Sequence, residues 1–212
     1  MACNNLLLQN EDILCISCRE ELPVTHQHTA ISSQVMGKFY GKVRIENAAC
    51  YLYFTKGGIV QKLFHQLKYN KHPEISYFLG QLYAISLLDS NFMHGIDEIV
   101  MVPLHPKKQK TRGYNQVEGF AKALSEVFNI PINNKILYKT QKTDSQTTKN
   151  LLQRNYKRKE VFAVQNNSDK KGTHFLLLDD ILTTGATLEV CSKKLLEIPE
   201  SKVSILCLAQ TV

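Results

Sequence analysis

Two adjacent carboxylates near the C-terminal end of the chain stand between a run of apolar residues and a loop of small polar residues. From Phe175 to Thr187 the order is four apolar residues, Asp179 and Asp180, two more apolar residues and a Thr/Gly loop, and a helical pattern starts at Leu188. Backbone N–H groups and Thr hydroxyls at the positive end of a helix can surround a phosphate. The carboxylates can accept hydrogen bonds from vicinal sugar hydroxyls, directly or beside a Mg²⁺ ion. The stretch therefore predicts a sugar-phosphate site; a buried strand that ends in a capped turn is the alternative interpretation.

A second segment carries charge suited to phosphate, and it follows an apolar run that ends at Val102. Four Lys/Arg residues lie within the six positions 107–112, and Arg112 is followed by Gly113. The glycine allows the backbone to turn sharply, while the Arg112 guanidinium offers a bidentate fork to a phosphate. A charged surface loop without a ligand is the alternative interpretation.

The elements that must position these two segments alternate between strands and helices. Apolar runs predict strands at Ala48–Phe54, Glu98–Pro103, Ile136–Tyr138, Phe175–Leu178 and Val203–Leu208. Helical spacing predicts helices at Ile59–Tyr69, Ile75–Leu88, Val117–Phe128 and Leu188–Leu196. This alternation indicates an α/β fold with a mostly parallel sheet whose faces are covered. Ligands of such sheets lie outside the carboxyl ends of the strands, so we expect the loops after Val102 and after Leu178 to meet at one crevice.

Composition and charge restrict the class of protein. The chain has 212 residues, 43% of them hydrophobic, which suits one ordinary domain with a small appendage. No apolar run approaches the ~18 residues of a membrane span, and no secretory signal pattern begins the chain, so we expect a cytoplasmic protein. The net charge is +7, and residues 103–171 hold 15 Lys/Arg and 5 Asp/Glu, a balance of +10. Such a block favours polyanions, namely pyrophosphate, nucleotides or nucleic acid, although a solvated lysine surface is common.

Three of the six cysteines have metal-ligand spacing. Cys15 and Cys18 are separated by two residues, and Cys3 lies twelve positions before Cys15. Such thiolates predict a structural Zn²⁺ in a small module of residues 1–35, ahead of a main domain at 36–212. A redox-active or incidental pair is the alternative. The other cysteines stand in apolar surroundings and are predicted to be core thiols: Cys50, Cys191 and Cys207.

The segment from Phe175 to Thr187 resembles the phosphoribosyl-pyrophosphate (PRPP) signature of type I phosphoribosyltransferases. The resemblance implies that Asp179 and Asp180 hold the ribose hydroxyls, with Mg²⁺ accompanying PRPP. It implies that the loop holds the 5′-phosphate through Thr183, Thr184, Gly185, Ala186 and Thr187. Members of that family that act on 6-oxopurines carry an Asp in place of Thr183, so its absence argues against a 6-oxopurine substrate.

The whole chain is similar to the ComF family, whose members are phosphoribosyltransferase-like and associated in some bacteria with DNA uptake during natural transformation. The similarity rests on four segments in family order: Tyr53–Tyr69, Pro103–His105, Arg112–Gln116 and Lys139–Thr148 with Leu151 and Arg154 after it. It implies that Leu104 and His105 lie in a pyrophosphate loop and that residues 140–159 form a hood over the site.

One departure from the ComF pattern concerns the cysteines. Family members commonly begin with two Cys-x-x-Cys pairs, and the partner of Cys3 would fall just before Met1. Either the natural chain starts upstream, or another residue is the fourth zinc ligand. His26 and His28 are the candidates in this sequence.

Three functions remain open at this level. The first is an active phosphoribosyltransferase, a pentosyl-transferring glycosyltransferase, acting on an unidentified acceptor. Its oxocarbenium-like transition state requires neutralisation of the leaving pyrophosphate, for which His105 and Arg112 are candidates. The second is a PRPP- or nucleotide-binding protein without catalysis that serves DNA uptake through partner proteins. The third is a direct binder of single-stranded DNA that uses the cysteine module and the basic block.

Overall fold

The computed structural model describes residues 2–3, 6–29, 33–104, 111–140, 162–165 and 168–212. Its centre is a four-stranded parallel sheet in the order β1-β6-β5-β2. The strands of this sheet are β1 (Ala48–Phe54), β2 (Glu98–Met101), β5 (His174–Leu182) and β6 (Lys202–Thr211). A separate antiparallel pair consists of β3 (Leu137–Lys139) and β4 (Phe162–Val164). The predicted α/β fold with a parallel sheet is confirmed.

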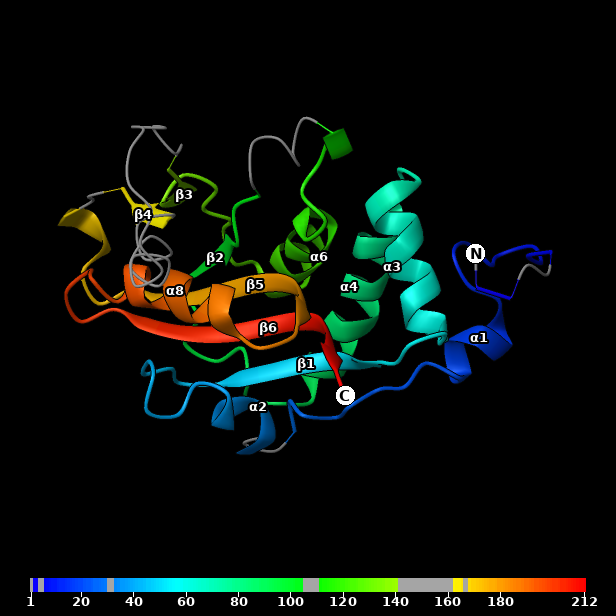
Figure 1. Cartoon of the computed structure of the whole chain (residues 1–212), viewed down its shortest axis with the longest axis horizontal. Helices are drawn as coiled ribbons and strands as arrows, with labels where there is room; N and C mark the ends of the chain where they lie inside the picture. The colour runs from blue at the N-terminus through cyan, green and yellow to red at the C-terminus, as the bar shows by residue number, and fades with distance from the viewer. Residues whose placement is uncertain (1, 4–5, 30–32, 105–110, 141–161, 166–167) are drawn as a thin grey trace, which may run out of the picture.

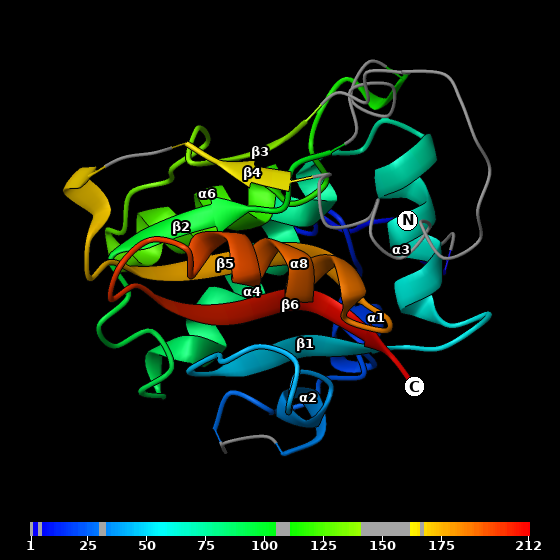
Figure 2. The same cartoon turned by 60° about the vertical axis from the view of Figure 1, so that its left-hand side comes forward.

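Helices cover both faces of the sheet, as Figures 1 and 2 show. One face is covered by α3 (Ile59–Tyr69), α4 (Glu74–Leu88) and α6 (Glu118–Phe128). The other face is covered by α8 (Ala186–Leu195) and α2 (Ser33–Gly37), while α1 (Ile16–Glu20) lies near α3 at one end. A short 3₁₀ turn, η1 (Ser168–Lys170), precedes β5.

Alternation along the central strands explains the two-sided core. In β5, Leu176 and Leu178 pack toward the α3/α4/α6 face, whereas Phe175 and Leu177 pack toward the α8 face. All four side chains are fully buried. A strand buried on both faces is apolar at every position, which is why the sequence shows a continuous apolar run here.

Several element boundaries differ from those that the sequence predicts. Helix Ile59–Tyr69 has the predicted bounds, and the other predicted helices shift by one or two residues. The strand predicted at Phe175–Leu178 continues to Leu182, because β6 pairs with it beyond the end of the apolar run. The helices α1 and α2, of five residues each, are absent from the prediction, since so short a segment shows no periodicity.

The N-terminal segment packs against the main body of the molecule. Ile13, Leu14 and Leu22 belong to the same core cluster as Leu63, and Val24 forms a bridge with Leu52 on β1. The division into units at residue 35 stays a prediction. Within the described ranges, no helix combines the length and apolar character needed to cross a membrane.

Candidate functional site

Both carboxylates of the acidic pair lie inside β5. The prediction that they follow the end of this strand is wrong, because β5 continues to Leu182. β6 pairs with β5 through the register Asp179–Cys207. On the other side, β2 accompanies β5 only as far as Leu178, where Val102 donates the last backbone hydrogen bond. Pro103 follows and has no N–H with which to continue the ladder. From Asp179 onward, the side of β5 that faces β2 is therefore open.

A cavity of about 650 Å³ occupies this open side. As predicted, the loops after β2 and β5 meet there. Its walls come from α3, the β2–α6 segment, the β3–β4 pair, β5 and the start of α8. The lining residues are Lys68, Val102, Pro103, Leu104, Arg112, Asn115, Gln116, Val117, Lys139, Phe162, Asp179, Asp180, Thr184, Ala186, Thr187 and Val190.

The loop between β5 and α8 turns at a glycine directly before the helix. Gly185 has a φ angle of 79°, in the left-handed region that suits glycine, and it is the residue that precedes the helix. Because glycine offers no side-chain cap, the first N–H groups of α8 are left to water or to a ligand; only Ala186 N–H has a long contact of 3.4 Å, to the Thr184 hydroxyl. A small cavity of about 40 Å³ lies within this loop and includes Thr183 in its lining.

The segment after α2 supports this loop from outside. The Lys38 amine donates a hydrogen bond of 2.6 Å to the carbonyl of Thr183. The buried Phe39 ring lies 3.2 Å from the position that a Cβ atom on Gly185 would occupy. A side chain at Gly185 would therefore press on Phe39 as well as strain the backbone.

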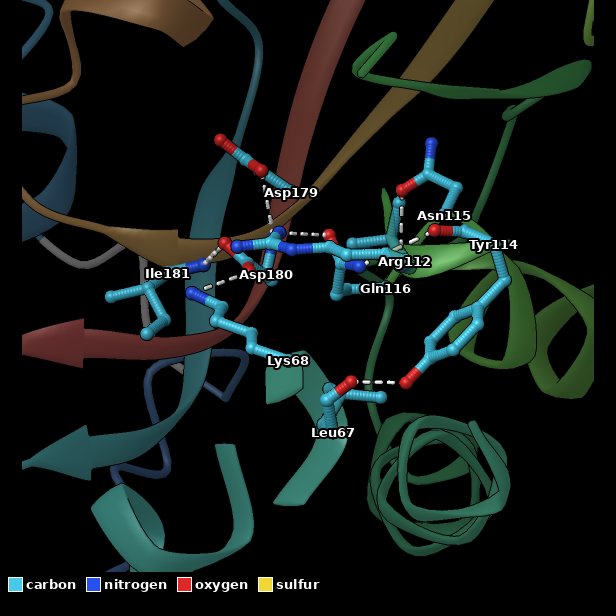
Figure 3. Close-up of polar contacts among 10 residues, drawn as sticks. Leu67, Lys68, Arg112, Tyr114, Asn115, Gln116, Asp179, Asp180 and Ile181 are labelled. Carbon is cyan, nitrogen blue, oxygen red and sulfur yellow. Dashed lines mark hydrogen bonds and ion pairs between the residues drawn. The ribbon is translucent and has the colours of Figure 1, made fainter. Parts of the chain in front are cut away.

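The two carboxylates differ in their partners. Asp179 Oδ1 accepts the N–H of Asp180 at 2.9 Å, and Asp180 Oδ1 accepts the N–H of Ile181 at 2.7 Å. Asp180 Oδ2 also forms an ion pair of 2.7 Å with the amine of Lys68 (Figure 3). Burial raises the pKa of Asp179 to about 7, and the negative charge of Asp180 acts in the same direction. Asp179 thus changes its charge near neutral pH.

This raised pKa predicts that Asp179→Asn stabilises the ligand-free protein at alkaline pH. The unfolded carboxyl has a pKa of ~3.9, so ionisation lowers folding stability as pH rises from about 4 to about 7, and the full penalty applies above that range. Asparagine stays neutral and can still accept the Asp180 N–H. A pKa that rises from ~3.9 to about 7 corresponds to ~4 kcal/mol, so we expect a melting temperature up to about 8–16 °C higher than wild type at pH 8 and a smaller difference at pH 5, measured by calorimetry. An exposed control, Asp89→Asn, should show no such pH-dependent gain; equal melting temperatures at pH 8 would contradict the assignment.

The loop that carries Arg112 is held by its own side chains. Arg112 Nη1 donates to Oε1 of the buried Gln116 at 2.7 Å, and Gln116 Nε2 donates to the carbonyl of Tyr114 at 3.3 Å. Asn115 Nδ2 donates to the carbonyl of Val102 at 3.1 Å, so the loop returns to the strand that it left. The guanidinium of Arg112 stands 5.7 Å from the ring centre of Tyr69. These contacts keep Arg112 at the cavity wall.

Most of the predicted ligand contacts line the two cavities. Those in the larger one are Asp179, Asp180, Thr184, Ala186, Thr187, Leu104 and Arg112, and Thr183 and Gly185 line the smaller one. Their roles toward a ligand stay predictions. His105, the lysines at 107, 108 and 110, and nearly all of the proposed hood at 140–159 lie outside the described residues.

Sequence reasoning gave no role to two cations of the cavity. Lys68 comes from the last turn of α3, and Lys139 comes from β3, where its amine stands 5.0 Å from the ring centre of Phe162. For Lys68 the available signal was its position in a segment similar to the ComF family. The same signal was available for Lys139, which begins the segment Lys139–Thr148.

The cysteine cluster forms as predicted. The sulfur atoms of Cys3, Cys15 and Cys18 lie within 4.8 Å of one another, and Cys3 Sγ is 3.6 Å from Cys15 Sγ. Three converging thiols fit a soft cation such as Zn²⁺. Neither His26 nor His28 belongs to this group of atoms. The other three cysteines, Cys50, Cys191 and Cys207, are fully buried core thiols, as predicted.

An open parallel sheet, with an acidic pair inside one strand and a Thr/Gly loop after that strand, defines the chain as an α/β protein. Solved structures similar to this chain include an adenine phosphoribosyltransferase, 15% identical, with a TM-score of 0.43 over 66% of this chain and 72% of that chain. The adenine phosphoribosyltransferase of Saccharomyces cerevisiae is 16% identical, with a TM-score of 0.41 over 66% of this chain and 71% of that chain. Likeness at this level carries no information on substrate.

The curated relatives point to proteins of DNA utilization and competence. The chain is 27% identical over 207 residues to DNA utilization protein YhgH of Escherichia coli K12, covering 96% of this chain and 87% of the relative. It is 27% identical to competence protein F of Haemophilus influenzae, over 70% of this chain and 66% of the relative. It is 28% identical to competence protein ComFC of Bacillus subtilis, over 57% and 50%. No family model matches the chain. The pairwise matches confirm the resemblance to the ComF family, with YhgH, competence protein F and ComFC as homologues.

Proposed function

We propose that this protein binds PRPP together with Mg²⁺ and acts as a phosphoribosyltransferase or phosphoribosyl-binding protein in the handling of DNA. The observation that carries the proposal is the composition of one cavity of about 650 Å³. It has the acidic pair Asp179 and Asp180 on one wall, the Thr/Gly loop at one end and the cations Lys68 and Arg112 on the side of α3 and the β2–α6 loop.

Each part of PRPP has a counterpart in this arrangement. The loop from Thr183 to Thr187 would take the 5′-phosphate, with free N–H groups at the start of α8 and a favourable helix dipole. The carboxylates of Asp179 and Asp180 would accept the ribose hydroxyls and offer oxygen ligands to Mg²⁺. The pyrophosphate would extend toward Leu104 and the guanidinium of Arg112, which can form bidentate bonds to phosphate.

Transfer of the phosphoribosyl group would break the bond between C1 and the pyrophosphate oxygen, and the fixed cations would stabilise the leaving charge. The described part of the chain presents no general base that points to a particular acceptor. Thr183 stands where members acting on 6-oxopurines carry an Asp, which disfavours those acceptors. The relatives are named for DNA utilization and competence, which supports a role in the handling of DNA, so nucleobases and nucleotides from DNA breakdown are the first acceptors to test.

Calorimetry of the purified protein with PRPP and Mg²⁺ tests binding. Release of pyrophosphate, measured across a panel of nucleobases and amines, tests transfer. We expect saturable PRPP binding that requires Mg²⁺. Binding without pyrophosphate release for any acceptor would favour the non-catalytic variant of the proposal, and absence of binding would overturn it.

We also propose a structural Zn²⁺ bound by Cys3, Cys15 and Cys18, because their three sulfur atoms converge. Cys15 stands immediately before α1 and Cys18 lies within it, and the neighbouring Leu14 is part of the main core cluster. The metal would thereby fix the start of α1 against the rest of the molecule. A direct role in chemistry is not proposed for this site.

Single-stranded DNA binding is the second candidate, favoured by the relatives' names and by the basic block. The two candidates make different predictions for Arg112 and its neighbours. If the Arg112 guanidinium binds the pyrophosphate group in the cavity, Arg112→Ala should lower PRPP affinity by at least about tenfold, since each charge-assisted hydrogen bond contributes ~1.5–3 kcal/mol. On this hypothesis Arg112 is the one of the four basic residues that binds the ligand, so single Ala variants of Lys107, Lys108 and Lys110 should each change PRPP affinity by less than about threefold.

The control for Arg112→Ala is Lys122→Ala, which removes an exposed cation from α6 outside the cavity.

If the basic block of residues 103–171 instead binds DNA, its charges should act almost interchangeably. The logarithm of the affinity for an oligonucleotide should then fall against the logarithm of the salt concentration with a slope of about −0.7 per neutralised phosphate. Equal, small losses of PRPP affinity at all four basic positions would contradict the role of Arg112.

A further inference from the structure

The last turn of α3 places one cation directly on the acidic pair. The amine of Lys68 is 2.7 Å from Oδ2 of Asp180, and the two side chains are 20% and 18% exposed. The pair is thus mostly withdrawn from solvent, where screening is weak. The C-terminal end of a helix also favours a positive charge. Asp180 is therefore neutralised by a fixed cation in the absence of a ligand.

The segment that carries Arg112 contacts α3 on both sides of Lys68, at the Leu67 carbonyl and at the Tyr69 ring. The hydroxyl of Tyr114 donates a hydrogen bond to the carbonyl of Leu67, one of the last carbonyls of α3, which lack partners inside the helix. The guanidinium of Arg112 stands over the ring of Tyr69. Figure 3 shows the hydrogen bond from Tyr114 to Leu67 and the ion pair between Lys68 and Asp180. The segment of Arg112 and Tyr114 is thus connected to α3 at two positions that flank Lys68, namely Leu67 and Tyr69.

We propose that Lys68 is a further ligand of the pyrophosphate group, held on Asp180 until the ribose occupies that carboxylate, and that Tyr114 is its positioning residue. This inference rests on the proposed function. Ribose hydroxyls that bond to Asp180 would compete with the Lys68 amine for the same oxygen. Lys68 lines the same cavity as Arg112, so its released amine has the diphosphate within the reach of a flexible four-carbon stem.

When the ribose replaces Lys68 on Asp180, and Lys68 moves to the diphosphate, every charged group still has a partner. Before binding, Lys68 neutralises Asp180; after binding, Asp180 would accept ribose hydroxyls and could offer an oxygen ligand to Mg²⁺, and Lys68 would pair with a phosphate. An amine left without a partner in a mostly enclosed site would be costly, so release is coupled to arrival of a ligand that carries the diphosphate. A sugar phosphate without the diphosphate would displace Lys68 from Asp180 without offering the amine a new anionic partner, so it should bind more weakly than PRPP.

Two ligands that differ only in the diphosphate test this inference, namely PRPP and ribose 5-phosphate. Their affinities are measured by calorimetry with Mg²⁺ for wild type and for Lys68→Met, which keeps an unbranched apolar side chain but removes the amine, a group that also stands 5.6 Å from the ring centre of Phe64. We expect PRPP affinity to fall by at least about tenfold, whereas ribose 5-phosphate affinity should not fall, because the amine that competes for Asp180 is gone. Lys62→Met is the matched control, because its amine lies on the same helix but bonds to the carbonyl of Ala2. It should change neither affinity.

Two further variants separate positioning from folding. Lys68→Arg should retain PRPP affinity within about threefold, since the cation is kept, and Tyr114→Phe should lower PRPP affinity by about threefold while ribose 5-phosphate affinity stays unchanged. Equal losses for both ligands in Lys68→Met, or no loss for PRPP, would overturn the inference while leaving the proposed function standing. A wild-type protein that does not bind PRPP would overturn the proposed function, and this inference with it.

Discussion

Asp180→Asn is expected to lower the affinity for PRPP by at least about tenfold, because it removes the charge from the carboxylate that would accept a ribose hydroxyl, and a charge-assisted hydrogen bond contributes ~1.5–3 kcal/mol. Asparagine has nearly the same shape, and its Oδ1 can still accept the N–H of Ile181. The substitution therefore leaves the course of β5 intact while it removes the ion pair with Lys68. Calorimetric titration with PRPP and Mg²⁺ measures the change.

The same variant has a signature that distinguishes it from Lys68→Met. Because Asp180 would contact the ribose and not the diphosphate, Asp180→Asn should weaken ribose 5-phosphate and PRPP alike. Glu189→Gln is the matched control. It removes a carboxylate from the first turn of α8 that pairs with Lys193 at 2.5 Å and lines neither cavity. Loss of affinity in Glu189→Gln as large as in Asp180→Asn would show that general charge near the loop, and not the acidic pair, governs binding.

The double variant Cys15→Ser/Cys18→Ser is expected to lose its zinc entirely, whereas the wild-type chain should carry about one Zn²⁺. Zinc-finger peptides bind structural Zn²⁺ with ~10–16 kcal/mol, and even about 4 kcal/mol lost from a chain of this size would lower the melting temperature by about 8–16 °C. The loss should reach the main body of the protein, because Cys18 and Leu14 pack in the core cluster that includes Leu63 of α3. Elemental analysis and calorimetry measure the two effects.

Two cysteines elsewhere in the chain give the control. Cys50 and Cys207 face each other on neighbouring strands of the central sheet and are fully buried. The variant Cys50→Ala/Cys207→Ala should retain its zinc even if the core loses some stability. Unchanged zinc content in the Cys15→Ser/Cys18→Ser variant would refute the metal site. Variants of His26 and His28 should keep their zinc, since neither ring joins the cysteine cluster.

Local pattern was sufficient for the strand–loop–helix unit that carries the acidic pair. The apolar run from Phe175 to Leu178 required a strand buried on both faces, and Gly185 marked the turn before α8. The amphipathic spacing of α3 predicted its bounds, Ile59–Tyr69, without error. The end of β5 was predicted too early, because Asp179 and Asp180 interrupt the apolar pattern although β6 continues to pair with them. Strand pairing depends on the neighbouring strand, which a local pattern does not contain.

The sequence by itself thus determined the α/β class, the order of the elements, the acidic pair with its Thr/Gly loop, and the three cysteines. Tertiary structure alone decided which cations face that pair. Lys62 and Lys68 both lie on α3, and only the packing of the helix turns Lys68 toward Asp180 while Lys62 faces Ala2. The hydrogen bond from Tyr114 to Leu67 joins residues 47 positions apart. Such contacts depend on how a helix is rotated and where a loop returns to the sheet, and these are set by side-chain packing over the whole core.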